Sequence, residues 1–204
     1  MSNGEGGAPG YYETSGNDGA EGAPGYWAPP QPLPSVNVDA IDQNEEACFW
    51  DEVLAFGEID MRNTTQMVDD ALGAAGDNPL GTLTITDHGG PGRQQIGDEQ
   101  LSVAALNDPE HPEMREAMQR LYGHFGEDGK INLGGCEVGA GPEGEALARE
   151  VVGLTGVPVS AGLETQNPLP GYEGPVLTCY PPVEEGAEIE CDIDGVPTEQ
   201  TLAQ

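Results

Sequence analysis

Two residues with complementary chemistry stand just beyond two short apolar segments of the chain. His88 follows residues 82–86 (TLTIT) and opens a glycine-rich stretch, and Cys136 follows residues 130–133 (KINL) and two glycines. A histidine that accepts the thiol proton converts a cysteine into a strong nucleophile. His88 and Cys136 are therefore the candidate catalytic residues, provided that the fold brings them together.

The segments before these two residues are predicted to be buried β-strands, because both are short, apolar or β-branched, and closed by glycine-rich turns. Amphipathic helical patterns separate the predicted strands, and this alternation is typical of an α/β fold with a mostly parallel sheet flanked by helices. The other expected elements are strands at residues 35–41 and 157–161 and helices at residues 63–76, 107–126 and 141–156. Neighbouring parallel strands place their carboxyl ends at one edge of the sheet, where ligand crevices lie. We therefore expect His88 and Cys136 to meet, although they lie 48 positions apart.

The composition divides the chain into three parts. Residues 1–35 are rich in glycine and proline, residues 36–165 hold the alternating α/β pattern, and residues 166–204 are again acidic and proline-rich. The outer parts are predicted to be flexible tails, since they offer too little apolar surface to offset the entropy of ordering. The last part contains one expected hairpin, at residues 176–180 and 188–193. The first contains a repeat, GAPGYY at residues 7–12 and GAPGYW at 22–27, which is an anchor for a protein partner, an anchor for this protein's own surface, or a low-complexity spacer.

Two further patterns predict how the central part is packed. The helix expected at residues 107–126, capped by Asn107 or Asp108, carries the clearest apolar stripe, and we interpret this stripe as core. Its members are Met114, Met118, Leu121, Tyr122 and Phe125. An apolar patch at residues 48–56 is expected to begin the packed domain, and the polar residues 93–102 to form a loop or short hairpin over the site.

The charge of the chain is extreme, with 37 acidic and 6 basic residues and a formal net charge of −31. Such a surface repels phosphate backbones and anionic lipids, so nucleic-acid and membrane-surface partners are excluded. The acidity has two interpretations: solubility in a salt-rich milieu, or attraction of a basic substrate or partner. No apolar run reaches the length of a membrane span and no secretory signal is recognisable. We expect a cytoplasmic location or export by a non-standard route.

The four cysteines are too few for a disulfide scaffold in a chain of 204 residues. Cys179 and Cys191 are spaced to staple a hairpin in an oxidising compartment, whereas Cys48 stands alone before an apolar patch. The cysteine pattern therefore leaves the redox compartment open.

Other roles compete for Cys136. Taken alone, a cysteine is most often a buried structural thiol. A zinc site built from Asp87, His88 and Cys136 lacks a fourth ligand. The other histidines, His111 and His124, are interpreted as surface residues at helix ends. No metal or other cofactor is expected.

The two strand ends resemble those of the caspase-like cysteine peptidases, a group that includes caspases, gingipains, legumain, clostripain and separase. In that group an apolar strand ending in His-Gly is paired with a later apolar strand ending in Cys. Residues 84–98 (TITDHGGPGRQQIGD), 131–144 (INLGGCEVGAGPEG) and 154–162 (LTGVPVSAG) are more closely similar to a bacterial caspase-like domain of unknown function that often stands near the start of large surface proteins. The resemblance covers about residues 80–163 and implies a caspase-like sheet.

The resemblance also implies peptide-bond cleavage, with His88 as the general base and Cys136 as the nucleophile. In the group, the oxyanion is held by the backbone N–H groups of the glycine after the histidine and of the cysteine itself, which here are Gly89 and Cys136. The sequence departs from the group just before the nucleophile. Gly134 stands where an acidic or amide residue is common, and Gly135 stands in place of alanine.

These observations predict a cysteine endopeptidase acting on a protein or peptide substrate, with basic residues in that substrate because the surface is acidic. The alternative is a catalytically inactive caspase-like module with a structural or interaction role in a bacterial or archaeal surface assembly. In that case the aromatic repeat of residues 1–35 would hold a protein partner.

Overall fold

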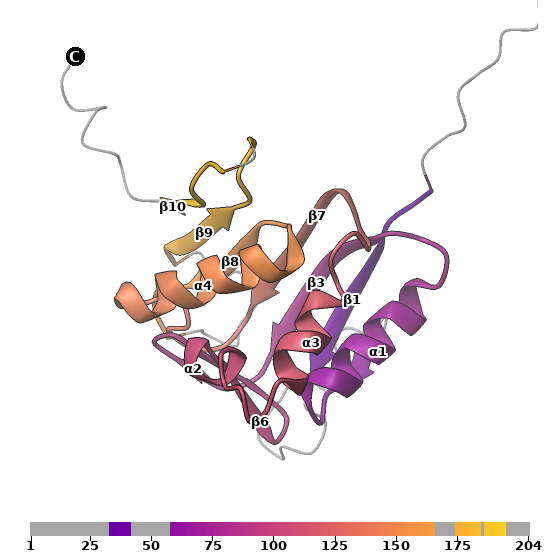
Figure 1. The fold of residues 1–204 in the computed structure, drawn as a ribbon, viewed down its shortest axis with the longest axis horizontal. Helices are drawn as coiled ribbons and strands as arrows, with labels where there is room; N and C mark the ends of the chain where they lie inside the picture. The colour runs from indigo at the N-terminus through magenta and orange to yellow at the C-terminus, as the bar shows by residue number, and fades with distance from the viewer. Residues whose placement is uncertain (1–32, 42–57, 166–173, 185, 195–204) are drawn as a thin grey trace, which may run out of the picture. The chain divides into compact units, whose positions relative to one another are not determined.

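The computed structural model of the chain describes residues 33–41, 58–165, 174–184 and 186–194, which form an α/β domain (Figure 1). The strands are β1 (Val36–Ile41), β2 (Glu58–Asp60), β3 (Leu80–Thr86), β4 (Gly89–Gly90), β5 (Arg93–Ile96), β6 (Glu99–Ser102), β7 (Phe125–Leu133), β8 (Val159–Gly162), β9 (Val176–Tyr180) and β10 (Glu190–Asp194). The helices are α1 (Thr64–Ala75), α2 (Val103–Leu106), α3 (Glu113–Gln119) and α4 (Gly141–Thr155).

The main sheet has seven strands in the order β10-β9-β8-β7-β3-β1-β2. The strands from β2 to β8 in this order pair in parallel, whereas β9 is antiparallel to β8 and β10 is antiparallel to β9. The predicted α/β class with a mostly parallel sheet is confirmed. The hairpin expected in the last part of the chain forms as β9 and β10, and it continues the main sheet through the pairing of β9 with β8.

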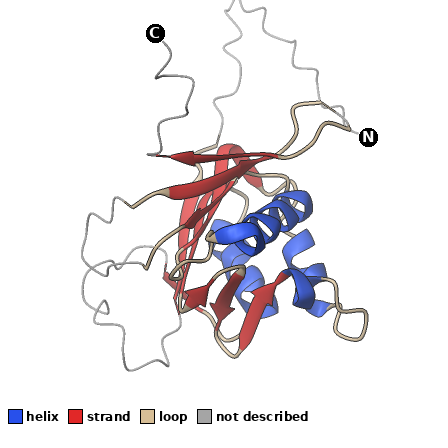
Figure 2. Ribbon diagram, turned by 90° about the vertical axis from the view of Figure 1, so that its left-hand side faces the viewer, coloured by secondary structure: helices blue, strands red, loops and turns tan. Residues whose placement is uncertain are grey.

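Helices α1, α3 and α4 lie on one face of this sheet (Figure 2). Side chains alternate between the two faces of a strand, and the sequence follows this rule. The side chains of Leu83, Ile85 and Ile131 are buried toward the helices, whereas Thr84 and Asn132 between them are polar and only partly buried. The apolar core therefore fills the space between one face of the sheet and the helices.

Single residues determine where the two longest helices, α1 and α4, begin or end. The Asn63 side chain accepts a hydrogen bond from the Gln66 N–H at 2.9 Å and caps α1. Helix α4 has Pro142 in its first turn and ends at Gly156, which takes a left-handed conformation with φ of 73°. Because α4 starts soon after Cys136 and ends before β8, it spans the sheet from its carboxyl edge to its amino edge.

The helix predicted over residues 107–126 is wrong at both ends. Asn107 closes the short helix α2, and α3 covers only Glu113–Gln119. The chain then turns at Gly123, whose φ is 79°, and Phe125 begins strand β7. Tyr122 is 68% exposed, so it is not core. The apolar spacing suited one helix, but it runs across a helix, a turn and a strand.

The polar residues 93–102 form the hairpin β5–β6, which with β4 makes the small three-stranded sheet. Of the tail predicted over residues 1–35, residues 1–32 with the aromatic repeat lie outside the described residues, and so does the apolar patch at 48–56. Among the described helices, none has the length and apolar character needed to cross a bilayer.

Candidate active site

The two strands that precede His88 and Cys136 are direct neighbours in the main sheet. Strands β3 and β7 are parallel, and Ile85 pairs with Leu133 at their carboxyl ends. The Gly134 N–H donates to the Ile85 carbonyl at 2.7 Å and extends the contact by one more residue. His88 and Cys136 each lie three residues beyond this last pair. The segments that carry them therefore leave the sheet side by side, as the sequence predicts.

The backbones next to the two candidate residues are in close contact. A Cβ atom on Gly135 would lie 2.9 Å from the Gly89 Cα, and one on Gly89 would lie 2.9 Å from the Gly135 Cα and 2.5 Å from the Val138 side chain. Real Cβ atoms do not approach other atoms this closely, so only glycine fits at both positions. This contact accounts for the glycine at position 135.

A buried amide side chain, which sequence reasoning missed, holds the two segments together. Gln94 on β5 is fully buried, and its Oε1 accepts a hydrogen bond from the Gly135 N–H at 2.8 Å. Its Nε2 donates to the Gln95 carbonyl at 3.0 Å and, at 3.4 Å, to the carbonyl of His88. One side chain thus contacts the residue before Cys136 and the backbone of His88. A polar hairpin gives no sequence signal that its glutamine turns inward.

Cys136 opens the turn between β7 and α4. Cys136 forms no disulfide, and the residue is partly exposed. The next residue, Glu137, has φ of 58°, a left-handed conformation that costs a residue with a side chain about 1–2 kcal/mol. The turn is anchored by hydrogen bonds from the Glu137 N–H to the Glu164 carbonyl at 3.0 Å and from the Gly139 N–H to the Gly162 carbonyl at 2.9 Å. The backbone around the thiol is therefore fixed on the side of β8 as well as on the side of β3.

His88 has an exposed side chain in the loop between β3 and β4. The carboxylate of Asp87 accepts hydrogen bonds from the His88 N–H at 2.6 Å and from the Gly97 N–H at 3.2 Å. Asp87 therefore ties the His88 loop to the turn of the β5–β6 hairpin. The loop that carries the imidazole is therefore held at its start by Asp87.

The N–H of Gly89, the first predicted oxyanion donor, is not used by the β4–β5 ladder. The Gln95 N–H donates to the His88 carbonyl at 2.8 Å, so Gly89 and Gln94 are the non-hydrogen-bonded pair of the β4–β5 ladder. The N–H of Gly89 is consequently directed away from β5. The ladder therefore leaves this N–H to other acceptors.

The charges near the site are mixed. Asp87, Glu137 and Glu164 supply carboxylates beside the two loops. Arg93 is exposed, and its Nε would lie 2.8 Å from a Cβ placed on Gly90, so its guanidinium lies against the His88 loop. In the described part of the chain no three or more His, Cys, Asp or Glu side chains are grouped so that they could hold a metal ion.

Comparison with known proteins gives one family. The family described as "Domain of unknown function (DUF4347)" matches residues 58–166, just over half of the chain, including both candidate residues. No curated protein and no solved structure matches the chain.

Proposed function

The chain belongs to the DUF4347 family, and we propose that it is a cysteine endopeptidase in which Cys136 is the nucleophile and His88 the general base. One observation carries the proposal. A partly exposed cysteine outside the disulfide and an exposed histidine follow two neighbouring parallel strands. Each lies three residues beyond the last pair of residues that joins these strands. The contact between Gly89 and Gly135 supports it, since it draws together the backbones on which the two side chains stand.

The reaction would proceed by acyl transfer. His88 removes the proton of the Cys136 thiol, and the sulfur attacks the carbonyl carbon of the scissile peptide. When the C–N bond breaks, His88 returns the proton to the leaving amine, which leaves a thioester on Cys136. A water molecule then gives a proton to His88 and attacks the thioester. The C–S bond breaks, His88 returns this proton to the sulfur, and the new carboxylic acid leaves as a carboxylate after losing its proton to solvent.

The oxyanion formed in both steps needs fixed donors. The N–H groups of Gly89 and Cys136 are the proposed pair, and each such donor is worth about 10²–10³ in rate. The closeness of Gly89 to Gly135 supports their convergence on one substrate oxygen. The caspase-like arrangement of the site is part of the same proposal, because the sheet is mixed and mostly parallel, with the candidate residues at the carboxyl edge.

A cleavage assay with the full chain tests this function. Fluorescein-labelled casein should be cleaved by the wild-type chain, not cleaved by Cys136→Ala, and cleaved at least about 100-fold more slowly by His88→Ala. Cys48→Ser is the matched control, since it removes the other cysteine that lies outside the disulfide, and it should retain full activity. Cleavage that persists in Cys136→Ala would contradict the proposal.

The alternative is a non-catalytic interaction module, and a surface groove lined by Tyr122 and Tyr180, which does not include His88 or Cys136, favours it. In that case the folded wild-type chain cleaves neither casein nor a mixture of random peptides. It also shows no difference in reactivity between Cys136 and an ordinary thiol.

A further inference from the structure

A surface groove at the amino edge of the sheet collects all the aromatic side chains of the described residues. These are Tyr122, Phe125 and Tyr180, and none of the described residues in the buried core is aromatic. Tyr122 and Tyr180 are 68% and 39% exposed. Aromatic residues are enriched at binding surfaces, whereas single exposed aromatics carry no such meaning. Their concentration in one groove marks it as a binding site.

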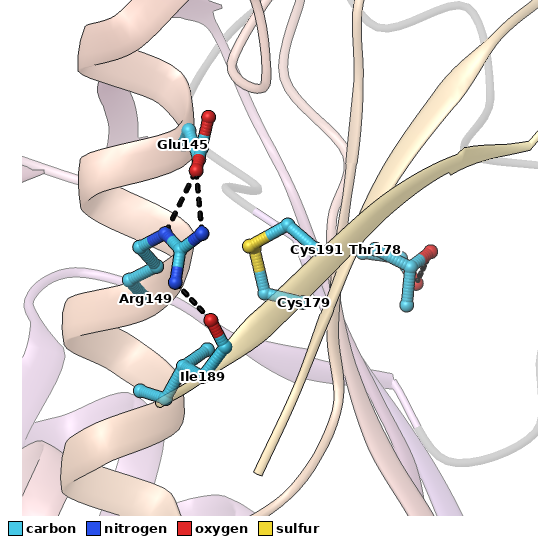
Figure 3. The surroundings of a disulfide bond; sticks show 7 residues. Glu145, Arg149, Thr178, Cys179, Ile189 and Cys191 are labelled. Atoms are coloured by element: carbon cyan, nitrogen blue, oxygen red, sulfur yellow. Dashed lines mark hydrogen bonds and ion pairs between the residues drawn. A yellow bond between two sulfur atoms is a disulfide. The ribbon is translucent and has the colours of Figure 1, made fainter. Parts of the chain in front are cut away.

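The walls of this groove are fixed by contacts within the domain. A Cβ atom on Gly156 would lie 2.8 Å from the Tyr122 ring, so that ring rests on the left-handed turn that ends α4. The opposite wall is the β9–β10 hairpin, which is closed by the disulfide between Cys179 and Cys191. Arg149 of α4 bonds the Ile189 carbonyl and the Glu145 carboxylate, and so fastens this hairpin to the helix (Figure 3). A wall that is already ordered costs little to order on binding.

The lining also has a defined charge. Glu127, Glu184, Glu188 and Glu190 lie along the groove, and no Lys, Arg or His is among its described lining residues. Tyrosine faces attract ammonium and guanidinium groups, and apolar walls accommodate their aliphatic stems. With a volume of about 910 Å³, the groove has room for several residues of a peptide rather than a single ion.

We propose that this groove binds an extended, lysine- or arginine-bearing segment of a partner protein. The inference is independent of the proposed peptidase activity. The groove lies at the carboxyl end of α4 and the candidate active site lies before its amino end, and a helix of 15 residues spans about 22 Å. Aromatic faces would hold the side-chain stems, and the glutamates would hold the charged heads.

Fluorescence anisotropy tests the proposal. The probe is a fluorescein-labelled peptide of twelve residues in which lysine alternates with proline, and it is titrated with the full chain at near-physiological salt, about 0.15 M. Tyr122→Ala should weaken binding about fivefold, the equivalent of one exposed cation–π contact. Glu188→Gln should weaken it about threefold, as expected for a partly exposed ion pair. A peptide with glutamine in place of lysine should bind at least about fivefold more weakly.

The matched control is Glu113→Gln, the same change of charge on an exposed residue of α3 outside the groove. It should leave the affinity unchanged. Equal losses in Glu113→Gln and Glu188→Gln would overturn the proposal, because the peptide would then be following the net charge of the chain. Unchanged binding by a Tyr122→Ala protein with a native circular dichroism spectrum would also overturn it. So would dimers of the wild-type chain that dissociate in Tyr122→Ala, since a second copy would then be the occupant.

Discussion

At the scale of single residues, the candidate site depends on one buried amide. Gln94 accepts from the Gly135 N–H and donates toward the carbonyls of Gln95 and His88. Gln94→Leu would leave the buried Gly135 N–H without an acceptor, which costs about 1–3 kcal/mol of unfolding free energy. Urea denaturation measures this loss.

The adjacent residue supplies the control for that experiment. The Gln95 side chain donates only within its own hairpin, to the Gly97 carbonyl at 2.5 Å. Gln95→Leu should therefore cost less stability than Gln94→Leu and leave casein cleavage unchanged. Equal losses of stability and activity in the two variants would mean that Gln94 does not position the site.

Alanine substitutions at two glycines give a second prediction, because they should change the stability of the fold in opposite directions. Gly135→Ala would place a Cβ 2.7 Å from the Gln94 Oε1 and should destabilise the fold by about 1–3 kcal/mol. Gly153→Ala, on the exposed side of α4 with no atom within 4 Å, should stabilise it by about 0.5–1 kcal/mol. Thermal unfolding of both variants checks the pair, and stabilisation by Gly135→Ala would show that the two loops are not in contact.

At the scale of elements, the sequence predicts most of what positions the site. A short apolar and β-branched run followed by glycines locates β3, and Gly156 locates the end of α4. These signals are local. The predicted helix was wrong at Tyr122 and Phe125, because apolar residues continued at helical spacing by chance through a turn. Contacts with residues distant in the sequence decide which of these side chains are buried.

The hairpin β9–β10 gives a prediction at this scale. The disulfide closes a short loop, with a sequence separation of 12 between its cysteines, and such a cross-link contributes about 3 kcal/mol. Dithiothreitol should lower the unfolding free energy of the wild-type chain by about this amount and weaken binding of the lysine–proline peptide. The double variant Cys179→Ser/Cys191→Ser should not respond to the reductant. If it responds as the wild-type chain does, the effect does not come from this bond.

At the scale of the whole molecule, the net charge of −31 should make thermal stability and the recognition of basic substrates respond differently to salt. Screening of like charges should raise the melting temperature when salt increases from about 0.05 to about 0.5 M. If the acidity also attracts basic substrates, the same change should lower kcat/KM for a lysine-rich peptide and leave that for an uncharged peptide nearly constant. Equal salt responses for the two peptides would assign the acidity to solubility alone.

Contacts between segments that are distant in the sequence are the part of the structure that the sequence predicts least. Neighbouring parallel strands placed the backbones of His88 and Cys136 in adjacent loops, since parallel neighbours share an edge. The inward turn of Gln94 and the gathering of Tyr122 and Tyr180 depend on packing between segments that no spacing encodes. Their roles follow only from three-dimensional contacts.

The most direct test of the central claim is to identify which thiol reacts. The oxidised full chain is treated at neutral pH with a peptide that carries a chloromethyl ketone, and the labelled cysteine is located by mass spectrometry. We predict that Cys136 reacts at least about 100-fold faster in the wild-type chain than in His88→Ala, because the proposed mechanism needs His88 as the general base for attack by the sulfur. Labelling of Cys136 at the same rate in both proteins, or labelling of Cys48 in its place, would contradict the account.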